Sequence, residues 1–298
     1  MDGFAGRPAW RLTPHLYAWQ AGTGPAADAV PPGLPRGLAD AAGAGFPAVE
    51  CGLSWITRAA RGARHSGADL LAGTGRALRE RGLELAAVFV SLGTGADAGT
   101  VEAVAGLTRA VAAELGTRVL NVVTVPSPEE RGDRPVSWDG PVDRVAGPLA
   151  ALGRALEPDG VRVCWHPHDE SLRDDASGAR RVLDAAGAAP LAVCLDVGWA
   201  ERSGTGTLRV LDLLGDRVGS LHLRDLTADG DWCDALGEGV LDLPGIAARL
   251  TGSAFAGPVA VELMAERRRS TPLDPARAAA DSARALAAHG LLRSEARR

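Results

Sequence analysis

Short apolar runs rich in β-branched residues alternate along the chain with longer stretches, rich in Ala, Leu and Arg, in which apolar residues recur at helical spacing. The short runs are typical of buried strands, and the longer stretches predict amphipathic helices. The pattern predicts eight strands, at Leu12–Ala18, Pro47–Cys51, Leu83–Ser91, Arg118–Val125, Val161–His166, Leu191–Asp196, Val218–Leu223 and Val259–Glu262. It predicts helices at Gly67–Arg81, Thr100–Leu115, Pro141–Leu156, Ser177–Ala186, Thr207–Leu214, Leu243–Leu250 and Pro275–His289.

This alternation of strand and helix indicates the α/β class, with a sheet of parallel strands. Eight such units in a chain of 298 residues favour closure into one (β/α)8 barrel, a TIM barrel, over an open doubly wound sheet. No GxGxxG motif follows the first strand, so a dinucleotide-binding fold has little support. We therefore expect residues 1–298 to form a single TIM-barrel domain.

Composition narrows the class of partner. The formal net charge is −5, and 46% of the residues are hydrophobic, which supplies a large core but no basic stripe for nucleic acid. Met1–Arg11 lacks an apolar signal core, and no apolar run is long enough to cross a bilayer. The four cysteines form no CxxC pair and suit a reducing compartment. We expect a cytoplasmic protein that binds neither nucleic acid nor membrane; homo-oligomer formation stays open.

Polar side chains stand where the predicted strands end. The relevant segments are VECG with Glu50, VCWHPHDES with His166 and His168, VCLDVGW with Asp196, LHLRD with His222, Arg224 and Asp225, and VAVEL with Glu262. In a barrel, the carboxyl ends of all strands converge on one rim, so these side chains should meet across the mouth.

Four of these residues, from successive strands, predict a metal site: His166, Asp196, His222 and Glu262. Charged groups at the end of a buried strand are costly without a partner, and a divalent cation would serve two imidazoles and two carboxylates at once. The mixed nitrogen and oxygen set suits Mn²⁺, Co²⁺, Fe²⁺ or Zn²⁺ better than Ca²⁺, and Mg²⁺ is expected to fit it less well. A polar network without metal is the alternative.

Six segments, in order, resemble the xylose isomerase-like superfamily of sugar phosphate isomerases and epimerases, to which inosose dehydratase and 3-dehydroshikimate dehydratase also belong. They are GFPAVE, WHPHDES, LDVGWAERSG, GDRVGSLHLRD, ALGEGVLDLPGI and GPVAVEL. The resemblance extends from Gly45 to Leu292 and is strongest from Val161 onward. It is specific for the superfamily and not for a substrate.

The resemblance implies one divalent metal held by Glu, Asp, His and Glu from strands five to eight. Asp196, His222 and Glu262 match this pattern directly, whereas His166 occupies the position of the first Glu. The strand-five segment is similar to a branch with a YHNHD-type motif followed by D-x-x-W, here Asp196 to Trp199. Trp199 stands where epimerases often have a His that contacts the substrate.

The resemblance also implies the chemistry: a metal chelates a substrate carbonyl and a neighbouring hydroxyl, and a carboxylate or imidazole moves the α proton. Glu262, His166 and His168 are the candidates for that proton transfer, on a sugar or polyol substrate. We expect an isomerase or epimerase. A lyase that eliminates from a keto-sugar or keto-cyclitol is the alternative, because His166 and Trp199 replace residues that an epimerase uses on opposite faces of its substrate.

Three further residues are predicted to contact substrate. Glu50 could bind hydroxyl groups or form a loop salt bridge, and Trp199 could stack on a sugar or simply pack. By strand alternation Arg224 shares the side of His222, while Asp225 could orient that histidine from behind. The polar loop Pro126–Pro141 follows strand four and would either lie at the mouth or form an inert surface excursion.

Two other classes remain open from the sequence. A nuclease or phosphoesterase would need additional His and Asp ligands for a multi-metal site, and His15, His65 and His289 are predicted to sit poorly for that task. A non-catalytic barrel that serves as a partner subunit is compatible with the altered strand-five motif.

Overall fold

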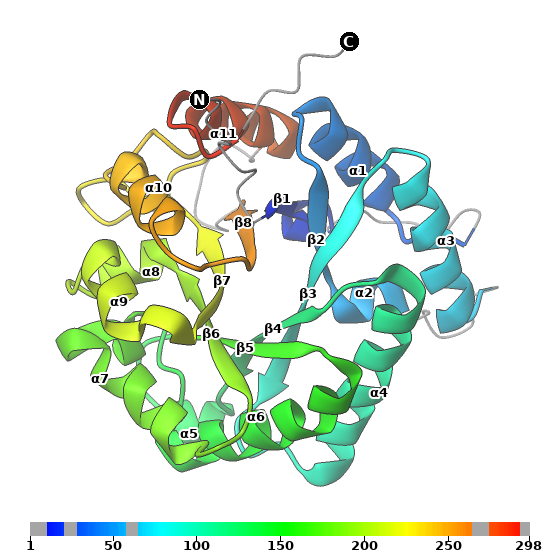
Figure 1. The fold of residues 1–298 in the computed structure, drawn as a ribbon. Coiled ribbons are helices and arrows are strands. Elements are labelled where there is room, and N and C mark those ends of the chain that lie inside the picture. Colours follow the sequence, from blue (N-terminus) through cyan, green and yellow to red (C-terminus); the bar gives the residue numbers. More distant parts are fainter. Residues whose placement is uncertain (1–10, 21–28, 58–64, 264–273, 293–298) are drawn as a thin grey trace, which may run out of the picture.

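Each strand pairs in parallel with its neighbours in the sequence, and the last strand closes on the first (Figure 1). The computed structural model describes residues 11–20, 29–57, 65–263 and 274–292. The strands are β1 Arg11–His15, β2 Ala48–Gly52, β3 Glu84–Gly93, β4 Val119–Val125, β5 Arg162–His166, β6 Leu191–Asp196, β7 Val218–Leu223 and β8 Pro258–Glu262. The predicted (β/α)8 barrel is confirmed.

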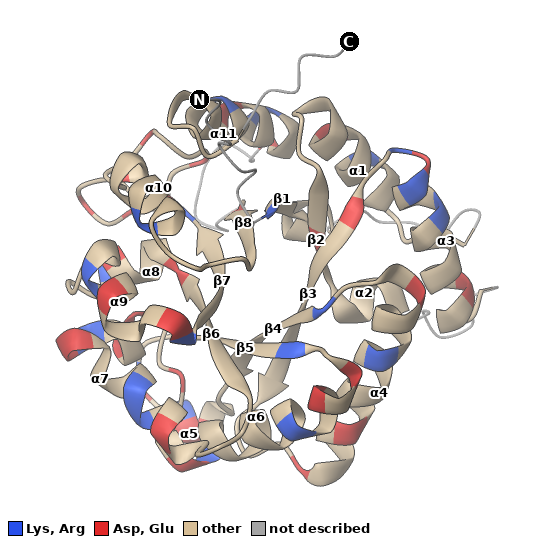
Figure 2. Cartoon of the chain, in the orientation of Figure 1, with Lys and Arg blue, Asp and Glu red and all other residues tan. Residues whose placement is uncertain are grey.

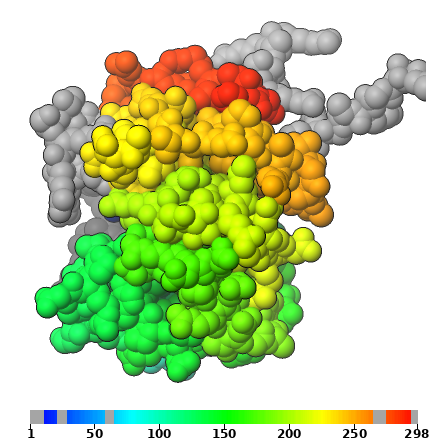
Figure 3. Space-filling model, turned by 90° about the vertical axis from the view of Figure 1, so that its left-hand side faces the viewer, coloured from blue at the N-terminus to red at the C-terminus, as the bar shows by residue number. Residues whose placement is uncertain are grey.

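Helices surround the barrel as the alternating pattern predicts. They are α1 Leu34–Gly43, α2 Leu53–Thr57, α3 Gly67–Arg79, α4 Ala98–Leu115, α5 Pro128–Arg131, α6 Val142–Leu156, α7 Asp169–Ala185, α8 Val197–Arg202, α9 Thr207–Leu214, α10 Leu243–Thr251 and α11 Pro275–Ala288. Short 3-10 helices occur at η1 Leu16–Trp19, η2 Glu157–Asp159 and η3 Gly215–Arg217. Figure 3 shows the segments from the middle of the chain to its end lying over one another in chain order, as successive βα units do around a barrel.

Side-chain alternation along the strands separates two kinds of core. One is the apolar core between strands and helices, to which Trp165 of β5 and Leu149 of α6 belong, both fully buried. Many of the residues that point inward are small or polar, such as Cys164 and His166 on either side of Trp165, and the aromatic Phe89 of β3 packs among the histidines. Because polar groups inside a barrel need partners, this inward set determines where the chemistry can lie.

Two predicted boundaries were wrong in ways that matter. Strand one was expected to run to Ala18, but β1 ends at His15 and the chain turns into η1. Leu16 and Trp19 stand three residues apart and are both buried, and the Trp19 indole donates to Asp40 of α1 at 2.8 Å. The apolar run thus spans a strand end and a helical turn. Because the strand ends before this helical turn, His15 lies at the carboxyl end of β1.

The second error concerns α7, which begins at Asp169 and not at Ser177. Residues 173–176 interrupt it, and Asp174, Asp175 and Ala176 have φ between 51° and 58°, in the left-handed region. The predicted helix therefore matches only the portion after this interruption. The remaining predicted bounds of strands and helices lie within two residues of those observed, and β6, β7 and α9 match their predicted bounds.

Charged residues of both signs are interspersed over the surrounding helices (Figure 2). Among the residues described, no helix combines the length and apolarity needed to cross a membrane.

Candidate metal centre

The barrel mouth gathers a buried polar cluster from seven strands. Its members are His15 of β1, Glu50 of β2, Asn121 of β4, His166 of β5, Asp196 of β6, His222 of β7 and Glu262 of β8. Strand register places several of them level with one another: His15 pairs with both Glu50 and Glu262, and Asp196 pairs with His222. The closed sheet thus assembles residues that are far apart in sequence.

The first group of three consists of His166, Asp196 and Glu262. The Nε2 atom of His166 lies 3.6 Å from Oδ2 of Asp196 and 3.6 Å from Oε2 of Glu262. Both ring nitrogens of His166 and the Oδ2 atom of Asp196 are buried and make no hydrogen bond with any residue that the structure describes. Buried polar atoms are almost always paired, so these orphaned donor atoms fit a divalent cation.

The local structure fixes the direction of Asp196. Its Oδ1 atom accepts hydrogen bonds from the amides of Gly198 and Trp199, at 2.8 and 3.1 Å, and so caps α8. The second oxygen, Oδ2, is left to face His166. A strand that ends in Asp directly before a helix therefore presents one carboxylate oxygen to the mouth.

His222 is held by carboxylates on both sides. Its Nδ1 atom lies 2.9 Å from Oε2 of Glu262, and its Nε2 atom lies 3.1 Å from Oε1 of Glu50. Asn121 donates to Glu50 at 3.1 Å and accepts from the Ser220 hydroxyl at 2.6 Å. Glu50, predicted to contact substrate, is fully buried and directed at His222 and Asn121.

The second group of three consists of His15, His222 and Glu262, so Glu262 belongs to both groups. His15 is 3% exposed, and within the described part of the chain neither of its ring nitrogens has a hydrogen-bond partner. Its ring centroid lies 5.4 Å from that of His222 and 5.1 Å from that of Phe89. From the sequence, His15 was expected to sit poorly for a multi-metal site; the structure places it at the end of β1, beside His222 and Glu262.

His168 lies beside this cluster and outside both groups. Its Nδ1 atom is 2.8 Å from Oδ1 of Asp139, and its backbone amide donates to the same carboxylate. Ser171 also donates to Asp139, at 2.5 Å. The imidazole packs edge-on against Trp199, with ring centroids 5.1 Å apart. Asp139 belongs to the polar loop after β4, so that loop does lie at the mouth.

Aromatic and cationic side chains line the mouth next to His168. Trp199 packs edge-on against Trp232, with ring centroids 4.9 Å apart, and the Arg224 guanidinium lies 3.7 Å from the Trp232 ring centre. Gly198 permits this packing, because a Cβ there would come within 2.6 Å of Trp232 and 2.5 Å of the Arg224 carbonyl.

Asp225 does not orient His222, contrary to expectation. Its carboxylate accepts from the amides of Leu226, Gly237, Gly239 and Leu241. It therefore organises the loop that follows β7, which contains Trp232.

Electrostatics favour positive charge in the cluster. Burial lowers the pKa of His166, but the carboxylates of Asp196 and Glu262 outweigh this and raise it to about 10. Burial likewise opposes the shift at Glu262, yet His166 and His222 hold the pKa of that carboxyl well below its usual range. At His15 burial is the largest effect and, with the neighbouring histidines, lowers the pKa. The carboxylates that raise the pKa of His166 are themselves kept in the charged form, and buried carboxylates beside imidazoles form surroundings that favour a cation.

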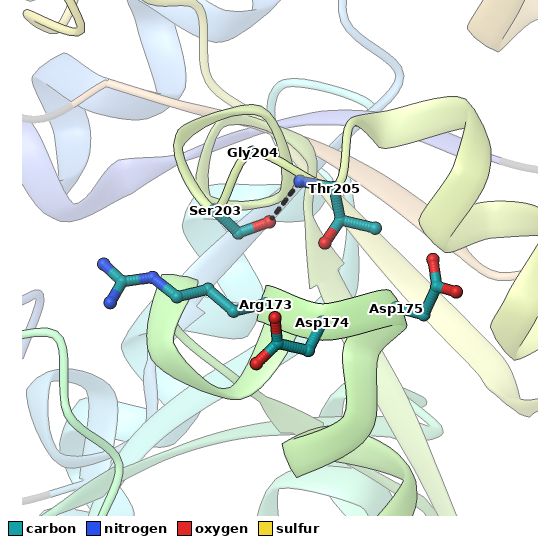
Figure 4. Close-up of a pocket in the computed structure, with 6 residues that line it drawn as sticks. All are labelled: Arg173, Asp174, Asp175, Ser203, Gly204 and Thr205. Carbon is teal, nitrogen blue, oxygen red and sulfur yellow. Dashed lines mark hydrogen bonds between the residues drawn. The ribbon is translucent and has the colours of Figure 1, made fainter.

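A surface pocket lies away from the cluster and includes none of its residues. It is lined by Arg173, Asp174, Asp175, Ser203, Gly204 and Thr205 (Figure 4). The Ser203 hydroxyl accepts from the Thr205 amide at 3.1 Å, and Asp175 pairs with Arg209. The pocket thus combines the left-handed turn of α7 with the connection between α8 and α9.

Comparison with known proteins agrees with this architecture. The sequence profile of the family described as xylose isomerase-like TIM barrel matches residues 38–289, and the chain belongs to this family. No curated protein gave a sequence match.

Solved structures share the fold at low identity. A sugar phosphate isomerase/epimerase from Parabacteroides distasonis is 15% identical, with 98% of each chain covered and a TM-score of 0.67. D-allulose 3-epimerase from a Methylomonas species is 18% identical, covers 94% of this chain and 98% of its own, and gives 0.68. A probable 3-DHS dehydratase from Bacillus anthracis is 12% identical, with 93% and 98% covered and a TM-score of 0.65.

Proposed function

We propose that the protein is a metal-dependent isomerase or epimerase of a sugar or polyol, which removes a proton next to a carbonyl. The observation that carries this proposal is the set of orphaned, buried donor atoms on His166 and Asp196 beside Glu262, at the mouth of the barrel. Catalytic residues of this fold come from the carboxyl ends of the strands, where these three lie. The epimerases of similar fold support the substrate class.

The metal ligands in this proposal are His166, Asp196, His222 and Glu262, holding Mn²⁺, Co²⁺, Fe²⁺ or Zn²⁺. When bound, the cation would polarise a carbonyl and an adjacent hydroxyl and so acidify the α C–H bond. Glu50 acts through His222: by accepting from Nε2–H it leaves Nδ1 with its lone pair facing Glu262. This replaces the predicted substrate contact of Glu50.

His168 is the residue that we assign to proton transfer, because it lies at the mouth without belonging to the ligand set. Asp139 fixes its Nδ1 side, which leaves Nε2 for a substrate atom. Glu262 offers a carboxylate as a second acid or base, and His166 would serve only as a ligand. Trp199 would contact the apolar face of a sugar, and Arg224 would bind a hydroxyl or an anionic group from the side of Trp232.

A lyase is the second candidate, and one observation favours it. Trp199, which has no acid–base group, packs against His168 where a second histidine would be expected for chemistry on the opposite face. Elimination needs one base and a polarised carbonyl, and a probable dehydratase shares the fold.

Proton exchange in D₂O tests the step that both reactions share. Keto-sugars and keto-cyclitols are incubated with the metal-loaded protein, and deuterium at the α carbon is followed by NMR. We expect exchange with the loaded protein and none after chelation. A lyase product would also absorb in the near ultraviolet as an enone. If the protein holds its metal yet exchanges no α proton in any such compound, the proposal fails.

The variant His168→Gln separates binding from chemistry. We expect it to retain the metal and to lose exchange by roughly 10²–10⁴-fold, the usual contribution of a positioned acid or base. Asp196→Ala should lose metal and exchange together. Retention of full exchange in His168→Gln would transfer the role of base to Glu262.

A further inference from the structure

We propose that His15, at the carboxyl end of β1, binds a hydroxyl group of the substrate on the side of the site opposite His168. The inference rests on the proposed function and narrows its substrate class. It requires a hydroxyl in addition to the carbonyl and the adjacent hydroxyl that the cation would hold. A polyhydroxylated keto-sugar or keto-cyclitol meets this requirement, and hydroxyacetone does not.

His15 is a buried side chain whose hydrogen-bonding groups are unused. It is 3% exposed, and no described residue offers either of its ring nitrogens a hydrogen bond. Oε1 of Glu50 lies 4.0 Å from Nδ1, beyond hydrogen-bond distance, and Glu50 is already bound to His222 and Asn121. Buried imidazoles normally place their ring nitrogens in hydrogen bonds. His15 therefore points to a partner that the described residues do not supply.

His15 stands at one end of a row of four imidazoles that crosses the mouth. Ring centroids are 5.4 Å apart from His15 to His222, 5.0 Å from His222 to His166 and 5.6 Å from His166 to His168. Because β1 and β5 are four strands apart in either direction around the closed barrel, the two ends of the row come from opposite walls. The two inner histidines are proposed metal ligands. A substrate chelated beside them would present one side to His168 and the other to His15.

The neighbours of His15 hold its ring close to the place of such a substrate. One donor atom each from His15, His222 and Glu262 lies within 4.8 Å of the others, so an oxygen held near His222 and Glu262 is also near His15. Phe89 packs against the His15 ring, with centroids 5.1 Å apart. Tyr17, half exposed on η1, has its ring centroid 6.0 Å away. His15 is thus fixed by aromatic contacts and lies beside a residue that reaches the surface.

The charge around His15 favours a hydroxyl over an anionic group. Burial lowers the pKa of His15, so the ring is neutral at neutral pH and carries one N–H donor and one lone pair. A hydroxyl both donates and accepts, so it can pair with either nitrogen. A carboxylate or phosphate in the same place would meet the negative charges of Glu50 and Glu262.

Deoxygenated compounds test the contact. The metal-loaded protein is titrated by calorimetry with D-fructose, D-allulose and 2-keto-myo-inositol and with their singly deoxygenated analogues, and α-proton exchange in D₂O is followed in parallel. In the wild type, we expect removal of one particular hydroxyl to weaken binding roughly 10- to 100-fold, the effect of one buried hydrogen bond. In His15→Phe, which keeps a ring without polar atoms, the parent compound should bind as weakly, and removal of that hydroxyl should cost nothing further.

Two further variants and the metal content supply the controls. His15→Gln offers an amide donor and acceptor and should recover part of the affinity that His15→Phe loses. His289→Gln, at the exposed end of α11, should bind every compound as the wild type does. His15→Phe should retain as much metal as the wild type, because the proposal makes His15 a substrate contact and not a ligand.

The outcomes separate this inference from the proposed function. Binding that depends on His15 and on one hydroxyl, without α-proton exchange, would support the contact and overturn the proposed function. Exchange with the same dependence on every hydroxyl in His15→Phe and the wild type would overturn the contact and leave the proposed function intact. If circular dichroism shows that His15→Phe is misfolded, His15→Gln decides, because an unchanged penalty for every missing hydroxyl overturns the contact. Failure of all three parent compounds to bind overturns both.

Discussion

At the scale of single residues, the main feature is how buried carboxylates are divided between direct and indirect roles. Asp196 and Glu262 direct oxygens at histidines that we propose as ligands, whereas Glu50 lies behind His222 and is itself held by Asn121. The arrangement Asn121–Glu50–His222 fixes the ring and its tautomer, which is the usual function of a carboxylate behind a metal-binding histidine.

Replacing Glu50 with Gln should therefore weaken metal binding without removing a ligand. The amide fills the same volume, but it can no longer supply the charged acceptor for His222. We expect metal affinity to fall about 10- to 100-fold, measured by competition with a coloured chelator. Glu84→Gln is the matched control. Glu84 is exposed at the amino end of β3, away from the barrel mouth, and pairs with Arg11. Equal affinities in both variants would contradict the role given to Glu50.

The sequence identified the site residues that stand at strand ends and missed those defined by geometry. Asp196 and Glu262 were recognisable because each ends a predicted strand, and His222 because it stands one residue before the end of its strand. Asn121 could not be found in this way, because it lies inside β4 among apolar neighbours and faces inward only by alternation. His15 was expected to sit poorly for a multi-metal site, and the strand predicted to run to Ala18 did not show that it stands at a strand end. Asp139 was missed because no local pattern shows that a loop returns to His168.

The cysteines give a second prediction at this scale. Cys51, Cys164 and Cys194 are buried, and Cys233 is partly exposed. Burial raises the pKa of Cys164 to about 12 and that of Cys51 further still. Since only the thiolate reacts, neither should be modified at pH 8 in the folded state. We expect a thiol reagent to titrate one group in the native protein and four in denaturant; fast reaction of three or four native thiols would contradict the buried placement.

At the scale of elements, α7 contains the most unusual backbone. Asp174, Asp175 and Ala176 occupy the left-handed region in succession, and each such residue costs roughly 1–2 kcal/mol in a non-glycine. The pattern of apolar positions predicted only the regular portion from Ser177 onward, because an interruption without Gly or Pro leaves no mark in periodicity. The strained turn borders the surface pocket of Figure 4 and lies outside the proposed metal centre.

Glycine at this turn should stabilise the fold. Asp174→Gly removes the Cβ that opposes a φ of 51°, at an exposed position. We expect the free energy of unfolding to rise by about 0.5–1 kcal/mol, measured by urea denaturation. Arg180→Gly is the control within the regular part of α7, where glycine should cost about 1 kcal/mol. Loss of stability in both variants would show that the turn is not strained.

At the scale of the whole molecule, the barrel makes the proposed metal centre a property of the closed fold. The ligands come from β5 to β8, and His15 comes from β1, which pairs with β8 to complete the sheet. The alternation of strands and helices was enough to predict this closure, because eight parallel βα units of such length have few other solutions. Which inward-facing residues meet at one level depends on strand register, and register cannot be derived from periodicity alone.

Metal should consequently stabilise the folded chain as one unit. The unfolded chain separates the ligands by tens of residues, so it binds metal far more weakly than the barrel does. At a free metal concentration of 100 times the dissociation constant, stabilisation should reach about 2.7 kcal/mol. Tryptophan fluorescence and far-ultraviolet circular dichroism should report a single transition at a raised midpoint, and chelator should reverse the shift. Asp196→Ala should lose most of the shift, whereas Glu84→Gln should keep it, because only the first removes a proposed ligand. A stoichiometrically bound metal that leaves the midpoint unchanged would place binding outside the closed barrel.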